Sequence, residues 1–67
     1  MQETRPPKIS LAAARVNAGM MQKDAAQKIG IALNTLKRYE AGKSIPRVDM
    51  LEKISLVYGY PMEYIRV

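Results

Sequence analysis

The segment from Gln22 to Gly42 constrains the fold most, because it contains two short helical patterns separated by one glycine. The first pattern, residues 22–29, places small or apolar side chains on one face: Ala25, Ala26 and Ile29. Such a narrow stripe allows another helix to approach closely. Gly30 follows, and a glycine just past a helix end can close the last turn in the left-handed conformation. The second pattern, residues 33–41, is expected to bury Leu36 and Tyr39.

The helix expected at residues 33–41 carries long polar side chains away from its buried face. Asn34 and Arg38 are four residues apart and therefore lie on one side of that helix, with Lys37 beside them. Asn and Arg match the hydrogen-bonding edges of adenine and guanine in the major groove of DNA. The alternative interpretation is an ordinary solvated polar face.

Composition limits the remaining possibilities. The 67 residues make one domain near the lower size limit for folding without disulfides or metal, so a compact, mostly helical core is expected. The chain has no Cys and no His, which argues against catalysis, a metal site or a cofactor. A net charge of +5 favours an anionic partner without identifying it. No apolar run is long enough to span a membrane, and the first residues lack a signal-peptide pattern, so a cytoplasmic location is expected.

The rest of the chain predicts further short helices. Residues 1–8 contain two adjacent prolines and are expected to form a flexible arm before a domain at residues 9–67. Ser10 is a suitable N-cap for a helix at residues 11–18. A helix at residues 48–58 is expected to turn one face inward: Val48, Leu51, Ile54, Ser55 and Tyr58. With a last turn at residues 62–65, the expected fold is an all-α bundle of five short helices.

The run from Gly19 to Pro46 resembles the Cro and lambda-repressor type of helix-turn-helix, the XRE family. The family pattern is matched at many fixed positions: Gln22, Ala26, Gly30, Thr35, Tyr39, Glu40, Gly42, Lys43 and Pro46. The resemblance extends over residues 11–65. Met21 and Ala32 depart from the pattern, because they stand where capping residues are usual and cannot cap a helix with their side chains.

The resemblance implies a transcriptional regulator that binds double-stranded DNA and has no chemistry of its own. The base-reading candidates lie on the helix at residues 33–41: Leu33, Asn34, Lys37 and Arg38. Leu33 would meet a thymine methyl group. The phosphate-binding candidates surround that helix: Gln22, Thr35, Lys43, Ser44 and Arg47. For Gln22 and the loop cations the alternative is simple solvation, and for Thr35 it is a structural role.

The resemblance also implies a partly buried ion pair between Arg15 and Glu40 that ties the recognition helix to the scaffold. A weak homodimer on a palindromic operator is expected, because one short helix contacts too few base pairs to select a site. Its surface would use apolar side chains without an assigned burial: Met50, Leu56, Met62 and Tyr64. The competing hypothesis is an antitoxin-like module on the same fold that masks a protein partner, although such a module is expected to carry a longer partner-binding tail. Either hypothesis allows a regulatory protein partner.

Overall fold

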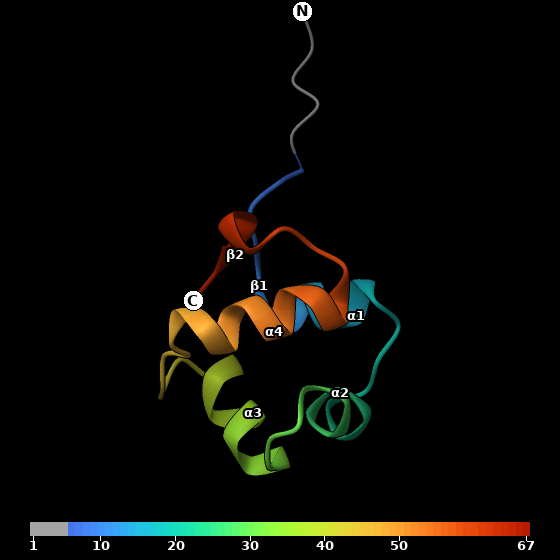
Figure 1. Cartoon of the computed structure of the whole chain (residues 1–67), viewed down its shortest axis with the longest axis vertical. Helices are drawn as coiled ribbons and strands as arrows, with labels where there is room; N and C mark the ends of the chain where they lie inside the picture. The colour runs from blue at the N-terminus through green and yellow to red at the C-terminus, as the bar shows by residue number, and fades with distance from the viewer. Residues whose placement is uncertain (1–5) are drawn as a thin grey trace, which may run out of the picture.

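The computed structural model describes residues 6–67, which form four α-helices, one short 3-10 helix and two very short strands. The helices are α1 (Leu11–Asn17), α2 (Gln22–Ile29), α3 (Leu33–Glu40) and α4 (Val48–Tyr58). Their positions agree with the sequence-based prediction to within one residue at each end. Figure 1 shows α2 and α3 together at one end of the molecule, with α4 and α1 forming the layer above them.

The prediction of an all-α bundle of five helices was wrong at the C-terminal end. The last helical segment is a single 3-10 turn, Met62–Tyr64, and it is followed by a strand, β2 (Ile65–Arg66). This strand pairs in parallel with β1 (Ile9–Ser10), so that Ile9 lies opposite Ile65. Two-residue strands are too short to produce the alternation that reveals a strand in a sequence. Figure 1 shows the pair at the end of the molecule opposite α2 and α3.

The helix ends are capped in different ways. The Ser10 side chain caps α1 by accepting a hydrogen bond from the Ala13 backbone N–H at 3.1 Å. As predicted, Met21 and Ala32 precede α2 and α3 without any side-chain cap. Gly30 ends α2 with a φ of +90°, a conformation that side chains other than glycine rarely adopt, and its N–H donates to the Ala26 carbonyl. Gly30 thus permits the tight turn that leads into α3.

The core lies where the four helices and β2 meet. Its buried members are mainly the predicted ones: Leu11, Ala14, Ala25, Ala26, Ile29, Leu36, Ile54, Tyr58 and Ile65. Tyr39 and Leu51 pack against this cluster while staying partly exposed. The prediction that Val48 faces inward was wrong, since 65% of this residue is exposed. Pro46, two residues earlier, is buried instead, and Val48 only begins α4.

The Tyr58 hydroxyl is the one buried side-chain polar atom in residues 6–67 without a hydrogen-bond partner. Burial, helped by the negative charge of Glu40, raises the pKa of Tyr58 to about 12. A buried donor without a partner costs free energy, because water no longer solvates it. The core therefore contains one unfavourable polar group close to the ion pair described below.

The segment predicted as a flexible arm, residues 1–8, lies mostly outside the described residues, which begin at Pro6. The Tyr60 hydroxyl donates a hydrogen bond to the carbonyl oxygen of Pro7. Together with the β1 and β2 pairing, this contact joins the beginning of the described chain to its C-terminal segment. We call β1, β2 and the 3-10 turn the terminal end, and α2, α3 and residues 41–47 the recognition end.

Candidate nucleic-acid interface

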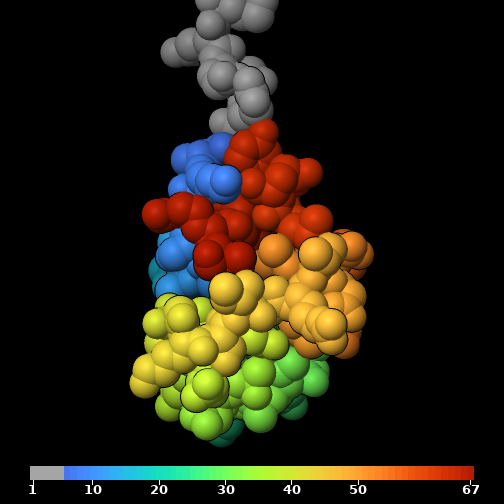
Figure 2. Space-filling view, turned by 90° about the vertical axis from the view of Figure 1, so that its left-hand side faces the viewer, coloured from blue at the N-terminus to red at the C-terminus, as the bar shows by residue number. Residues whose placement is uncertain are grey.

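The four predicted base-reading residues all lie on the exposed side of α3: Leu33, Asn34, Lys37 and Arg38. The opposite side of the helix carries Leu36, which is fully buried. When one face of an α-helix is apolar and the other carries long polar side chains, the helix can pack on a core and still present hydrogen-bonding groups to solvent. Figure 2 shows α3 and the loop that follows it, in green and yellow, forming the surface of the recognition end. The terminal end, in blue and red, lies at the other extreme of the same view.

The loop between α3 and α4 places further polar side chains beside this face. Lys43 and Arg47 are exposed, and Ser44 is half-buried. The Ser44 hydroxyl accepts a hydrogen bond of 3.2 Å from Nε of Arg38. The sequence did not reveal this contact, because it depends on the path of the loop around Pro46. It uses one of the five N–H donors of the guanidinium group and directs Arg38 toward the loop.

A network of hydrogen bonds ties the recognition helix to α1 and to the start of α2. Nε and Nη2 of Arg15 donate to Oε2 and Oε1 of Glu40, at 2.7 Å and 3.2 Å. A third donor, Nη1, reaches the Met20 carbonyl at 2.9 Å. Only 14% of the Arg15 side chain and 8% of the Glu40 side chain are exposed. The hydrogen bond to Glu40 raises the pKa of Arg15 above its ordinary value, so the guanidinium group stays charged.

Gln22 joins the same network, a contact that sequence reasoning missed. Its Nε2 donates to Oε1 of Glu40 at 2.9 Å. A carboxamide nitrogen has two protons, so this bond leaves one N–H of Gln22 for another acceptor such as a phosphate. Glu40 thus fixes the side chain that the sequence assigned to the DNA backbone. Thr35, the remaining phosphate candidate, is half-buried on α3.

The four residues suggested for a dimer surface differ in exposure. Leu56 projects from α4 with 82% of its surface exposed. Met62 and Tyr64 are half-buried in the 3-10 turn. The expectation that Met50 lies off the core was wrong, because Met50 packs against the buried cluster. The face of α4 that enters the core is wider than the sequence pattern indicated, since it also includes Val57.

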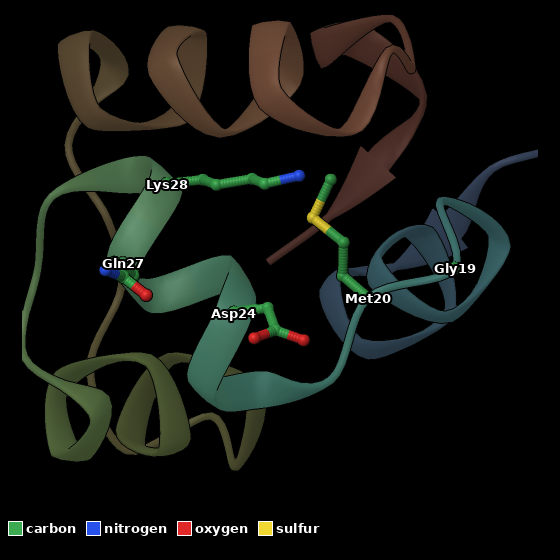
Figure 3. Close-up of a pocket in the computed structure, with 5 residues that line it drawn as sticks. All are labelled: Gly19, Met20, Asp24, Gln27 and Lys28. Atoms are coloured by element: carbon green, nitrogen blue, oxygen red, sulfur yellow. The ribbon is translucent and has the colours of Figure 1, made fainter.

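A separate hollow of about 540 Å³ lies between the α1–α2 turn and α2. Figure 3 shows Asp24 and Lys28 of α2 extending toward Met20 in this hollow, which Gly19 and Gln27 also line. No residue of α3 lines the hollow, so it is distinct from the face of the recognition helix. Within residues 6–67, no three His, Cys, Asp or Glu side chains are grouped as metal ligands. Among the same residues, none of the helices has the length and hydrophobicity of a membrane span.

Comparison with known proteins agrees with this geometry. A family model described as helix-turn-helix matches residues 11–65. The chain belongs to the XRE-type helix-turn-helix family. The match covers all four α-helices and reaches the first residue of β2, so the family assignment rests on the whole bundle and not only on α2 and α3.

Two curated relatives come from different bacteria. The HTH-type transcriptional regulator ImmR of Bacillus subtilis (strain 168) is 40% identical over 52 residues, which cover 78% of this chain and 41% of the relative. The cryptic phage CTXphi transcriptional repressor RstR of Vibrio cholerae is 35% identical over 48 residues, or 72% of this chain and 43% of the relative. The chain therefore spans less than half the length of these relatives. No solved structure matches it significantly.

Proposed function

We propose that this helix-turn-helix chain binds double-stranded DNA in a sequence-specific way and regulates transcription, with α3 entering the major groove. The observation that carries the proposal is the exposed side of α3, where Asn34, Lys37 and Arg38 project away from the buried Leu36. In helix-turn-helix proteins the second helix contacts base edges while the first crosses the backbone. In the same arrangement, side chains of α3 would contact base edges and Gln22 would contact a phosphate.

The flanking groups would supply the sequence-independent part of the affinity. Lys43 and Arg47 are exposed in the loop after α3, where the DNA backbone would run if that helix lay in the groove. Ser44 would contribute a hydroxyl, and Thr35 is a further candidate from the side of α3. Each lysine or arginine that neutralises a phosphate displaces condensed counterions. We therefore expect binding to weaken steeply with salt.

The name of RstR, a cryptic phage transcriptional repressor, favours a repressor of phage or mobile-element type, and the name of ImmR agrees with transcriptional regulation. A repressor of this kind needs no chemistry, metal or cofactor, and would act in the cytoplasm where its operator is. The deciding experiment is selection of bound sequences from a random duplex pool with the whole 67-residue chain. An enriched motif is the expected result. Recovery of no sequence above background would contradict specific recognition.

The proposal includes a weak homodimer on a palindromic operator. A single eight-residue recognition helix contacts few base pairs, and two copies would double the length of the site. Half-sites would then lie about one helical turn, roughly 10 to 10.5 base pairs, apart. Leu56 is the most exposed large apolar residue in the described chain and is our candidate for the centre of the interface.

The variant Leu56→Lys tests this interface. It should abolish cooperative occupancy of a palindrome while leaving affinity for an isolated half-site intact. The matched control is Val16→Lys, which adds the same charge at an exposed apolar residue of α1. Equal cooperativity in both variants would place the dimer contact elsewhere. It would not contradict the proposal that α3 contacts the bases.

A further inference from the structure

Two large apolar side chains are exposed where the two helices of the motif begin. Met21 immediately precedes α2 and is 73% exposed, and Leu33 is the first residue of α3 and is 37% exposed. Both side chains line one groove of about 320 Å³. Met21 makes no capping hydrogen bond, although a hydroxyl or carboxylate at this position would stabilise α2. Neither packing nor capping in the free protein accounts for a methionine here.

The charges around the groove indicate what kind of molecule would fill it. Lys23 and Lys37 also line it, against one carboxylate, Asp24. Lys37 lies next to Arg38 on the exposed side of α3, so the groove is continuous with the face assigned to base reading. A groove lined by two large apolar side chains and two lysines suits an apolar group that is carried by a polyanion. A neutral or cationic partner would gain nothing from the two lysines.

Double-stranded DNA offers such a group in the major groove, where each thymine exposes a C5-methyl between two rows of phosphates. The residues at the N-terminus of a recognition helix are those that reach base edges. Leu33 occupies that position in α3, and the groove brings Met21 to the same place from α2. A methyl group entering the groove would be covered by Leu33 of α3 and by Met21, the residue before α2.

We propose that Met21 and Leu33 together form a subsite for the 5-methyl group of a thymine in the bound DNA, which makes Met21 a specificity-determining residue. This inference rests on the proposed DNA binding. It extends base reading from α3 alone to the residue before α2, where the sequence indicated only a missing cap. It also gives the exposure of Met21 a physical reason, since burial of a side chain against a methyl group releases water from both surfaces.

The test uses the site obtained from the random duplex pool. Each thymine is replaced in turn by deoxyuridine, which removes the methyl group and keeps every hydrogen-bonding group of the base. For wild-type protein, we expect one thymine in each half-site at which the replacement weakens binding by about three- to tenfold, the usual scale for losing one buried methyl contact. The other thymines should respond less.

Variants then assign the methyl effect to residues. In Met21→Ser the replacement at that thymine should no longer weaken binding, because the apolar partner is gone. Serine can cap α2, so this variant should fold at least as stably as wild type, which a thermal melt checks. Leu33→Ser should give the same loss of methyl dependence. The control is Val16→Ser, which removes an exposed apolar side chain from α1 and should retain the full methyl effect.

The outcomes distinguish a failure of the methyl subsite from a failure of the proposed DNA binding. If wild-type protein binds the selected site but no thymine depends on its methyl group, the subsite does not exist, while DNA binding stands. A methyl effect that persists in Met21→Ser and disappears in Leu33→Ser would assign it to α3 alone and overturn the role of Met21. If the pool yields no enriched sequence, the proposed function itself fails.

Discussion

The terminal end and the recognition end hold their helices in place by different means. At the terminal end, Ser10 caps α1, two strands pair, and the Tyr60 hydroxyl bonds to the Pro7 carbonyl. At the recognition end, neither α2 nor α3 has a side-chain cap. Those helices depend on packing of their buried residues and on the Arg15, Gln22 and Glu40 network. The comparison teaches that one end is closed by hydrogen bonds to backbone groups, whereas α2 and α3 at the other end are held by packing and by bonds between side chains.

The largest effect should come from Glu40→Ala, which breaks the only side-chain network at the recognition end that the described residues contain. The variant leaves the largely buried Arg15 without its counterion and Gln22 without its acceptor. Removing one partner of a buried pair typically costs about 3–5 kcal/mol of unfolding free energy. In a 67-residue domain such a loss can unfold most molecules at 37 °C.

Thermal melts of Arg15→Ala and Glu40→Ala measure this effect. The matched control is Glu52→Ala, which removes an exposed glutamate from α4 and should change stability little. If both network variants melt like the control, the recognition end does not depend on the ion pair, and the contrast between the two ends is wrong.

The next effect concerns DNA affinity at the two ends. Arg38→Ala should weaken binding to the preferred site by roughly 1–3 kcal/mol and relax the preference at one base pair. The reason is that the variant would lose the proposed pair of hydrogen bonds from the guanidinium group to a guanine. Lys43→Ala should weaken all sequences alike and flatten the salt dependence by about one unit of slope. Arg66→Ala removes a cation from the terminal end and should leave both quantities unchanged.

Binding titrations at several salt concentrations compare the three variants. Equal losses on specific and random DNA for Arg38→Ala would remove it from the base-reading set. An equal change in salt slope for Arg66→Ala and Lys43→Ala would mean that both ends contact phosphate. Because Arg38 also bonds to Ser44, a Ser44→Ala variant shows whether any loss arises through the loop.

A smaller effect on stability concerns Tyr58, whose buried hydroxyl lies in the core close to the network of Arg15 and Glu40. Tyr58→Phe removes the unpartnered group and should raise the unfolding free energy by about 1–3 kcal/mol at neutral pH. A lower melting temperature would contradict this, since it would mean that the hydroxyl has a partner in solution.

The pH dependence of the same variant has a definite sign. The pKa of Tyr58 is raised to about 12 in the folded protein, against roughly 10 in an unfolded chain. The unfolding free energy of the wild-type protein is therefore unaffected by ionisation of Tyr58 below pH 10 and falls as the pH rises toward 12. In denaturant titrations, the advantage of Tyr58→Phe over wild type should grow across this interval. A constant difference would show that the pKa is not raised.

The smallest effects come from the helix caps. Ser10→Ala removes the one side-chain cap found on the four described α-helices and should cost about 1 kcal/mol. Ala32→Ser introduces a hydroxyl at the start of α3 and should stabilise the domain by a similar amount. Denaturant melts compare the two. If Ala32→Ser does not raise the unfolding free energy, the backbone N–H groups at the start of α3 need no side-chain cap. The difference in capping between the two ends would then not affect stability.

Most of the helical framework was predictable because it depends on local patterns. Glycines after each helix and apolar spacing set the ends of α2 and α4 to the residue. The strand pair was not predictable, since Ile9 and Ile65 are far apart in sequence and each strand has only two residues. Val48 was assigned inward because periodicity alone cannot tell that the first residue of α4 stays exposed while Pro46 is buried.

The candidate site was predictable in its residue types and less so in its contacts. Asn34, Lys37 and Arg38 follow from helical spacing, so their common exposed face could be foreseen. The bonds from Gln22 to Glu40 and from Arg38 to Ser44 join different elements, and only the packed structure shows them.

The most direct test of the central claim is the change in backbone amide chemical shifts when the selected duplex is added to the labelled protein. We expect the large changes at the start of α2, along α3 and in residues 41–47, with little change in β1 and β2. A random duplex should perturb the loop cations more than the base-reading residues. Large changes confined to the terminal end would contradict the assignment of α3 as the recognition helix.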